Sequence, residues 1–409
     1  MYLRGGKRLF RNTMSGEKIY EGIFAVHKPQ GVTSADVIRK LQSHFNPSDL
    51  FRPWLETERE RRKRESNNQR RRRRTQQLDV KIGHGGTLDP LATGVLVTAV
   101  GKGTKQLQDF LLCTKTYETV VLFGAETDTY DVVGKVVKRA PYEHVTREAV
   151  EKALEQFRGK IMQRPPIFSA LRVNGKRLYE YAREGKEPPI EIKERPVEVT
   201  DLRILEWYEP GTHDYKWPEE APAEEKAAAE KLLAKADTLP AAPAAGEADE
   251  PASAKRKSPP ADSLKNEDAV VEAKKQKVTV EGRAAAAAVA VAPEQTAVPE
   301  AAETTSAETQ PDVSAESLQE PRSQPPAVKI TMTVSSGFYV RSLTHDLGKA
   351  VGSCGLMSSL VRSRQADFKL EPGQVLEYED LDAGEDVWGP KVKKFLEEWE
   401  AKRAAKDTE

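Results

Sequence analysis

Residues 83–96 concentrate the residue types of this chain that could do chemistry. The stretch reads GHGGTLDPLATGVL, so one histidine, His84, lies among glycines, and one carboxylate, Asp89, lies between a leucine and a proline. Glycines allow close approach of a ligand, and Pro90 fixes the backbone after Asp89. A rigid loop that presents one carboxylate from apolar surroundings suits a nucleophile or a general base. An ordinary Asp-Pro turn is the alternative that the stretch itself leaves open.

Other stretches that resemble reactive motifs fail on spacing. Residues 94–103 contain a Gly-Lys pair like that of a phosphate-binding loop, but the glycines are seven residues apart and no Ser or Thr follows the lysine. Ser342, His345 and Asp346 are triad residue types, yet neighbouring residues on a helix point about 100° apart and cannot form a relay. Two cysteines and six scattered histidines also predict no zinc site and no disulfide framework.

The elements that must hold the 83–96 loop are a mixture of helices and strands. Ser34 is interpreted as the cap of a helix with an apolar stripe to Phe45, and Thr146 as the cap of a helix that Gly159 ends. Alternation of apolar and polar residues predicts strands at 328–334 and about 196–207, which we expect to be neighbours. Residues 117–123 read as a strand, and Leu343, Leu347 and Val351 as one face of a helix. We therefore expect an α+β domain with a mainly antiparallel mixed sheet flanked by helices.

A polar, acidic segment interrupts this pattern. The 409-residue chain has a mean hydropathy of −0.63 and a net charge of zero, but residues 209–327 hold 23 acidic and 13 basic residues, so the remainder carries +10. The segment is rich in Ala, Pro, Glu and Ser and nearly lacks aromatic residues after Trp217, which predicts a disordered linker. Residues 21–208 and 328–400 are then one discontinuous domain. Its basic charge favours a polyanionic partner such as nucleic acid.

Two further segments differ from the predicted domain. Within an insertion at 46–80, residues 52–74 contain eleven Arg or Lys and four Glu, and Arg70 to Arg74 are consecutive. Repulsion favours an extended or loosely helical arm, either an RNA-backbone or nuclear-import patch or a solvated surface. Residues 1–20 resemble a weak mitochondrial presequence or an ordinary disordered tail. No apolar run reaches the ~18–20 residues of a membrane span, so we expect no membrane insertion.

Six ordered blocks cover nearly all of the chain outside the two insertions and the termini. In order they are HKPQGVTSADVI (27–38), GHGGTLDPLATGVL (83–96), KTYETVVLFGAETDTYDVVG (115–134), QRPPIFSALRVNGKRLYEYAREG (163–185), VSSGFYVRSLTHDLG (334–348) and LVRSRQADF (360–368). Together these blocks resemble the TruB branch of the pseudouridine synthases, most closely its eukaryotic, fungal-like members.

The resemblance implies roles for residues around one active site. Asp89 falls on the catalytic aspartate of the family, and Tyr117 on the tyrosine that stacks on the target base. Arg341 falls on the arginine that pairs with the catalytic carboxylate, with Tyr339 as a wall of the site. Leu360 falls on an apolar residue that lines the pocket, although a plain core role is the alternative.

Two more residues receive roles only through the resemblance. His84 matches the histidine that fills the space left by the flipped base, and Asp131 matches an aspartate that supports the flipped RNA loop; a turn residue is the alternative for Asp131. The implied fold is the pseudouridine synthase fold. The implied reaction isomerises uridine 55 of the tRNA TΨC loop, without metal or cofactor. The implied partner is the tRNA T-arm, with mRNA left open, and the implied state is a monomer without an obligatory protein partner.

Two other functions compete with this expectation. A guide-RNA-dependent pseudouridine synthase of a ribonucleoprotein would carry a C-terminal PUA domain, and only about 40 residues follow Phe368, so no PUA domain is expected. A non-catalytic RNA-binding or tRNA-folding module would be expected to lack Asp89, Tyr117 or Arg341. For localisation, the basic runs indicate the nucleus and the N-terminus indicates the mitochondrion, with the cytoplasm also left open.

Overall fold

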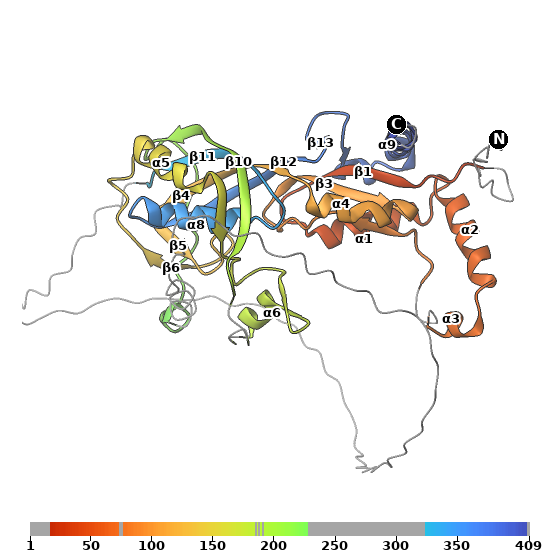
Figure 1. Ribbon diagram of the computed structural model, residues 1–409, viewed down its shortest axis with the longest axis horizontal. Helices are drawn as coiled ribbons and strands as arrows, with labels where there is room; N and C mark the ends of the chain where they lie inside the picture. The colour runs from red at the N-terminus through yellow and green to blue at the C-terminus, as the bar shows by residue number, and fades with distance from the viewer. Residues whose placement is uncertain are drawn as a thin grey trace, which may run out of the picture. The chain divides into compact units, whose positions relative to one another are not determined.

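The computed structural model describes residues 17–72, 77–184, 186, 189, 192–227 and 324–406. None of the described helices is long and apolar enough to cross a membrane. The elements, drawn in Figure 1, are β1 Gly22–Lys28, α1 Ser34–Phe45, α2 Arg52–Lys63, α3 Asn67–Arg72, β2 Ile82–His84, β3 Thr93–Val100, η1 Gly101–Gln106, α4 Leu107–Leu112, β4 Lys115–Phe123, β5 Ala125–Thr127, β6 Val136–Arg139, α5 Arg147–Leu154, η2 Glu155–Phe157, β7 Gly159–Gln163, β8 Arg172–Val173, β9 Lys176–Arg177, α6 Leu178–Arg183, β10 Arg195–Tyr208, β11 Ala327–Val334, α8 Val340–Ala350, β12 Gly355–Gln365, β13 Phe368–Lys369, β14 Leu376–Glu377, η3 Tyr378–Leu381 and α9 Glu385–Lys406.

One mixed sheet organises the described residues. Its strand order is β14-β1-β3-β12-β4-β11-β10-β7, with β13 paired to β12 and β2 paired to β3. The β1–β14 and β3–β12 pairs are parallel, whereas the other pairs of this sheet are antiparallel. The expected α+β class, with a mainly antiparallel mixed sheet flanked by helices, is confirmed.

Strands from after residue 324 lie between strands from before residue 227. β11 pairs with β10 on one side and β4 on the other, and β12 lies between β3 and β4. The expected pairing of the strands at 196–207 and 328–334 is therefore confirmed. The two chain segments share one sheet and complete each other's hydrogen bonding.

The sheet buries two large apolar clusters. In one, β4, β10 and β11 pack with α5 and α8. In the other, β1 and β3 pack with α1, α2 and α9. The loop 85–92, which carries Asp89, connects β2 to β3 and contributes Leu88 and Leu91 to the first cluster.

Helix α1 begins one residue earlier than the sequence suggests. Thr33, rather than Ser34, is its N-cap: the Thr33 hydroxyl accepts a hydrogen bond from the Asp36 amide, and the Asp36 carboxylate accepts from the Thr33 amide. This reciprocal capping box satisfies two otherwise unpaired donors. The interpretation of Ser34 as the cap is wrong, and its hydroxyl is left for another role. The expected Thr146 cap of α5 is present.

The segment interpreted as a linker begins later than residue 209. Trp217 is partly buried against the sheet, and its indole nitrogen donates to the Phe123 carbonyl at 2.8 Å. Tyr142 packs edge-on against the Trp217 ring with centroids 5.6 Å apart. The Glu219 carbonyl also accepts from the Val136 amide at 2.8 Å. Residues 209–227 therefore belong to the folded body, and the rest of the predicted linker up to 323 lies outside the described residues.

The boundaries of the other two predicted segments also shift. Tyr20 packs against the second apolar cluster and donates to Glu397 at 3.4 Å, so the folded body includes residues from 17 onward. The possible targeting tail otherwise lies outside the described residues. The 46–80 insertion forms α2 and α3, and Trp54 and Leu55 are buried in the second cluster. Because of these contacts, the start of the basic insertion is part of the core.

Two deletion variants distinguish the stability contribution of the packed part of the predicted linker from that of the remainder. Replacing 228–323 by a Gly/Ser linker of about twelve residues is expected to raise stability by about 2 kcal/mol, because each halving of a loop returns ~0.6 kcal/mol. Replacing 212–325 also removes Trp217 and its contacts, at a cost of about 3 kcal/mol. Thermal melting of both variants beside the full chain tests this. Equal melting temperatures for the two deletions would contradict the packing role of Trp217.

Candidate active site

Asp89 lies in the loop that joins β2 to β3. The Ala92 amide donates to the Asp89 carbonyl at 3.1 Å, which closes a tight turn around Pro90. The Asp89 side chain is 39% exposed, whereas its sequence neighbour Leu88 is buried. The loop is therefore anchored by its leucine and presents its carboxylate to solvent.

Two buried side chains hold one half of this loop. Lys28, at the end of β1, is fully buried, and its ammonium donates to the carbonyls of Ala92 at 2.6 Å and Pro90 at 3.3 Å. Ser34 accepts from the Leu88 amide at 2.9 Å and donates to the Leu88 carbonyl at 3.2 Å. The hydroxyl that does not cap α1 thus fixes the residue before Asp89.

Burial changes the chemistry of Lys28. Desolvation lowers the pKa of Lys28 from 10.5 to about 8; the Asp89 charge opposes this and the Arg362 charge adds to it. The described contacts of the ammonium are backbone carbonyls. Lys28 is therefore a buried cation that serves as a backbone clamp.

The other half of the loop is held from β12. Arg362 is 1% exposed, and its guanidinium donates to the carbonyls of Val95 at 2.7 Å and Gly86 at 3.2 Å. Gln365 donates to the Gly85 carbonyl at 2.6 Å. Gly94 allows this approach, because a Cβ there would lie 2.3 Å from the Arg362 carbonyl oxygen and its φ is +105°. Both flanks of Asp89 are therefore fixed through the backbone.

Asp89, Arg341 and Asp131 form one charged cluster. The Arg341 Nε atom lies 3.0 Å from an Asp89 carboxylate oxygen and 3.7 Å from an Asp131 carboxylate oxygen. The side chains of Arg341 and Asp131 are each 8% exposed. Burial raises the pKa of Asp131, and the opposing effect of Arg341 does not cancel it. One buried guanidinium therefore lies beside two carboxylates, of which Asp89 is half-exposed and Asp131 is buried.

Arg341 is fixed in place by two further hydrogen bonds. It lies in the first turn of α8, and its two terminal nitrogens donate to the carbonyls of Thr129 at 3.1 Å and Phe168 at 2.9 Å. Asp131 accepts in turn from Thr129 at 2.7 Å and from the Val133 amide at 3.0 Å. Each nitrogen of the Arg341 guanidinium thus has a partner, so the side chain has little freedom to leave Asp89.

Aromatic and apolar side chains share one buried cluster with the leucines of the loop. Tyr117 on β4 is 9% exposed and packs in the same cluster as Leu88, Leu91 and Leu360. Arg362, which clamps the loop, is paired with Tyr117 across the strands. The β4–β12 pair therefore carries both Arg362, which holds the loop, and Tyr117, which shares a buried cluster with the loop leucines.

His84 and Tyr339 have different surroundings. His84 ends β2, and burial, followed by the Arg362 charge, lowers the pKa of its imidazole, so the ring is neutral at pH 7. Its Nδ1 atom is buried without a hydrogen-bond partner in the described structure. Tyr339 is the N-cap residue of α8, and its amide and carbonyl pair with the Gln163 side chain at 2.8 and 3.0 Å. No described contact joins either side chain to Asp89.

The chain's similarity to known proteins agrees with this arrangement. The family model "TruB family pseudouridylate synthase (N terminal domain)" matches residues 71–217. The "tRNA pseudouridine synthase 4" of Schizosaccharomyces pombe is 37% identical over 384 residues, covering 88% of this chain and 83% of that protein. Its namesake in Saccharomyces cerevisiae is 32% identical over 389 residues, covering 92% of this chain and 85% of that protein. The chain belongs to the TruB family of pseudouridine synthases.

A solved structure shows a weaker likeness. A Cbf5-Nop10-Gar1 complex aligns with a TM-score of 0.41 and 17% identity, covering 91% of this chain and 58% of that chain. A likeness at this level supports no inference about the function of the TruB-family chain described here.

The structure adds residues that the sequence patterns did not single out. Lys28, Arg362 and Gln365 hold the Asp89 loop, yet each reads as an ordinary polar residue in sequence, and Ser34, which also holds it, was interpreted only as a helix cap. Lys28 and Ser34 lie in the first TruB-like block, and Arg362 and Gln365 in the last. The sequence signal for these residues was therefore their place in the TruB-like blocks. The blocks indicate a shared fold, but they do not show which groups each polar side chain contacts. Among the described residues, no group of three or more His, Cys, Asp and Glu side chains is arranged to hold a metal ion.

Proposed function

We propose that this chain isomerises uridine 55 in the TΨC loop of tRNA to pseudouridine. The observation that carries the proposal is one half-exposed carboxylate, Asp89, held 3.0 Å from the buried Arg341 guanidinium on a loop clamped from both sides. The relatives that align along most of the chain are named tRNA pseudouridine synthase 4. The site and the relatives together favour catalysis on tRNA.

The reaction needs one ionised carboxylate. It breaks the C1′–N1 bond of the uridine, turns the base and joins C1′ to C5, and the proton lost from C5 is balanced by one gained at N1. The product is an isomer of the substrate, so neither an oxidant nor water is consumed. Whether Asp89 attacks C1′ or removes a sugar proton, it must act as an anion, and the Arg341 guanidinium lies 3.0 Å from it as an ion-pair partner.

The target base must leave the RNA stack before Asp89 can reach the sugar. Enzymes that act on a base extrude it into a pocket, and RNA loops release their bases more readily than duplexes do. We assign the extruded uracil to the aromatic and apolar side chains of Tyr117 and Leu360, which share one cluster with the loop residues Leu88 and Leu91. A single stacked base contributes ~1–3 kcal/mol, which is of the order of the unstacking cost.

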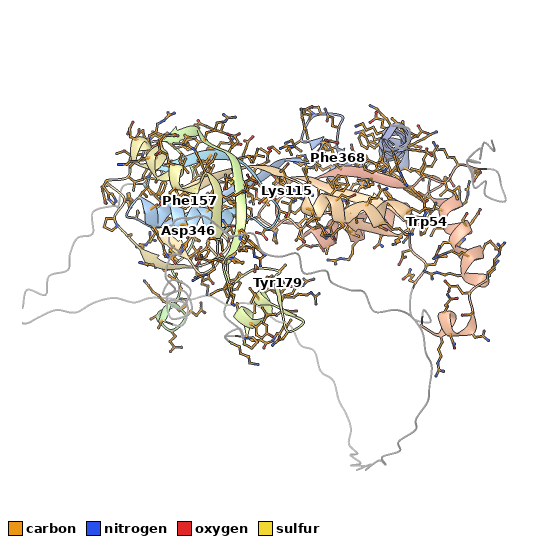
Figure 2. All side chains as sticks on the ribbon, viewed as in Figure 1. Trp54, Lys115, Phe157, Tyr179, Asp346 and Phe368 are labelled. Atoms are coloured by element: carbon orange, nitrogen blue, oxygen red, sulfur yellow. The ribbon has the colours of Figure 1, made fainter. Side chains whose placement is uncertain are left out.

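Basic and aromatic side chains lie near the Arg341 end of the site. The Tyr179 amide donates to the Ser169 carbonyl at 3.2 Å, next to Phe168, whose carbonyl holds Arg341. Arg177 and Arg183 lie over the Tyr179 ring at 5.5 and 5.1 Å, and Figure 2 labels Tyr179 on α6. Guanidinium groups with an aromatic ring suit both phosphate contacts and base stacking.

The deciding assay uses unmodified tRNA and no guide RNA. Purified full-length chain should convert uridine 55 of a tRNA transcript to pseudouridine, read by base-resolution mapping. Conversion only when a guide RNA is added would assign the chain to the ribonucleoprotein class. Binding of tRNA with no conversion under either condition would assign it to an RNA-binding or RNA-folding module.

Lys28 gives the proposed activity a pH signature. Because its folded pKa of about 8 lies below its ordinary value of 10.5, the folded state releases the proton first as pH rises. Raising the pH from 8 to 10.5 should therefore increase the stability of the fold, while activity falls as the clamp on Pro90 and Ala92 loses a donor. Activity and stability are expected to move in opposite directions over this window.

Lys28→Met tests this clamp directly. Methionine keeps the length of the side chain and removes the buried charge, so the melting temperature at pH 7 should change little. Activity should fall at least about tenfold, because a loop that shifts by a fraction of an ångström misplaces the carboxylate. The decline of activity above pH 8 should be absent from the variant's rate profile. A variant that keeps both the wild-type rate and that decline would show that Lys28 does not position the loop.

A further inference from the structure

A groove lies between α2 and residues 77–82. Its volume is about 550 Å³, and its lining includes three cationic side chains and two amide side chains beside Trp54. The cations are Arg61, Arg62 and Lys81, and the amides are Gln42 and Gln77. These groups donate hydrogen bonds, which suits an anionic ligand.

The two acidic residues of the groove, Glu58 and Asp79, already have hydrogen-bond partners in the protein. Glu58 accepts from Arg61 and lies 3.6 Å from Arg62. Asp79 accepts from the Asn46 side chain at 2.9 Å. Lys81 is exposed and makes no ion pair with the rest of the described chain. The groove therefore has a net positive charge that its own residues do not neutralise.

Helix α2 carries further positive charge next to the groove, and the start of the helix is packed against the core. Pro53 is buried, Trp54 and Leu55 belong to the second apolar cluster, and the Trp54 indole donates to Glu21 at 3.0 Å. Trp54 is labelled at the base of α2 in Figure 2. Residues 52–74 carry a net charge of +7. Because the start of the helix is packed into the core, part of this surplus occupies a defined position on the protein.

Strand β2 connects the groove to the catalytic loop. Ile82 lines the groove and begins β2, and His84 ends β2 directly before the loop that carries Asp89. Two residues of extended strand span ~7 Å, so the end of the groove lies within about one nucleotide's reach of His84 along the strand. When an RNA strand is bound at Asp89, its phosphates on either side of the target nucleotide lie at distances of this order from the target.

We propose that the groove between α2 and residues 77–82, together with the exposed arginines of α2, binds the phosphodiester backbone of the tRNA next to the target loop. The inference rests on the proposed function for the identity of the RNA. The contacts are to phosphates and carry no base specificity, so they set affinity and register rather than the choice of uridine.

A matched pair of variants tests the groove. Arg59→Gln/Lys81→Gln removes two exposed cations from α2 and the groove, and Arg147→Gln/Lys152→Gln removes two exposed cations from α5. Affinity for an unmodified tRNA transcript is measured over a range of KCl concentrations. The first pair should flatten the slope of log affinity against log salt by ~1.4–1.8 units, since each lost phosphate contact removes ~0.7–0.9. The second pair should leave the slope unchanged, and circular dichroism melting should be alike for both.

The outcomes separate the groove from the proposed function. An unchanged slope for the first pair, or an equal change for both, would overturn the groove as an RNA site. An unchanged slope with lost nuclear accumulation would assign the basic surface to an import protein and also overturn it. If the slope change is seen but the wild-type chain forms no pseudouridine, the groove assignment stands and the proposed function fails.

Discussion

Replacing Asp89 by asparagine should abolish pseudouridine formation and leave tRNA binding near the wild-type level. Asparagine keeps the shape of the side chain and can still accept from Arg341, but it can neither attack C1′ nor take a proton. Loss of the group that does the chemistry should slow single-turnover conversion by at least ~1,000-fold, or about 4 kcal/mol of activation free energy. The loop itself should keep its position, because Lys28 and Arg362 hold it through backbone carbonyls.

Asp131→Asn is the matched control for that result. Asp131 also lies beside Arg341, but it is buried and accepts from Thr129 and the Val133 amide. Asparagine can keep these two hydrogen bonds, so the control should lose less than about tenfold in rate. Asp89→Asn activity within tenfold of wild type would show that another group does the chemistry. Equal losses in the two variants would mean that the pair acts as one structural unit.

The parts of the fold that follow from local patterns could be predicted from the sequence. The pairing of β10 with β11 followed from alternation on both sides of a polar segment, and the Thr146 cap from a hydroxyl before an apolar stripe. The cap of α1 was misassigned because Thr33 and Ser34 are adjacent and both can cap. The capping-box spacing from Thr33 to Asp36 was the signal that distinguishes them.

The packing of residues 209–227 could not be predicted from composition. A window of mostly polar residues averages out one aromatic side chain, yet Trp217 alone makes a hydrogen bond, a ring contact and an apolar contact with the body. The supports of Asp89 were hidden for a related reason. A lysine that is 0% exposed and one on the surface look identical in sequence, and only tertiary structure brings β1 and β12 to the same loop. The glycines and the lone carboxylate of that loop were local signals and were read directly.

Replacing Arg341 by glutamine should destabilise the fold and remove activity together. The guanidinium lies between two carboxylates, and its other nitrogens satisfy the carbonyls of Thr129 and Phe168. Removing one partner of a buried charged pair costs about 3–5 kcal/mol, because the remaining charge stays desolvated. The unfolding free energy should fall by that amount at pH 7.5. Conversion of tRNA should fall at least ~100-fold, since Asp89 loses the charge that stabilises its anion.

The pH dependence of that variant identifies which carboxylate causes the loss. Burial already raises the pKa of Asp131, and without Arg341 it should rise further. Between the unfolded pKa near 4 and this raised folded value, the folded state holds the extra proton, so stability falls as pH rises through the window. Arg341→Gln should therefore melt at a higher temperature at pH 5 than at pH 7.5, relative to wild type at each pH.

Arg341→Gln/Asp131→Asn should recover stability at pH 7.5 and lose this pH dependence, while tRNA conversion stays low. If the double variant is as unstable as the single one, the loss comes from the unpaired Thr129 and Phe168 carbonyls, and Asp131 is not the buried charge that Arg341 compensates.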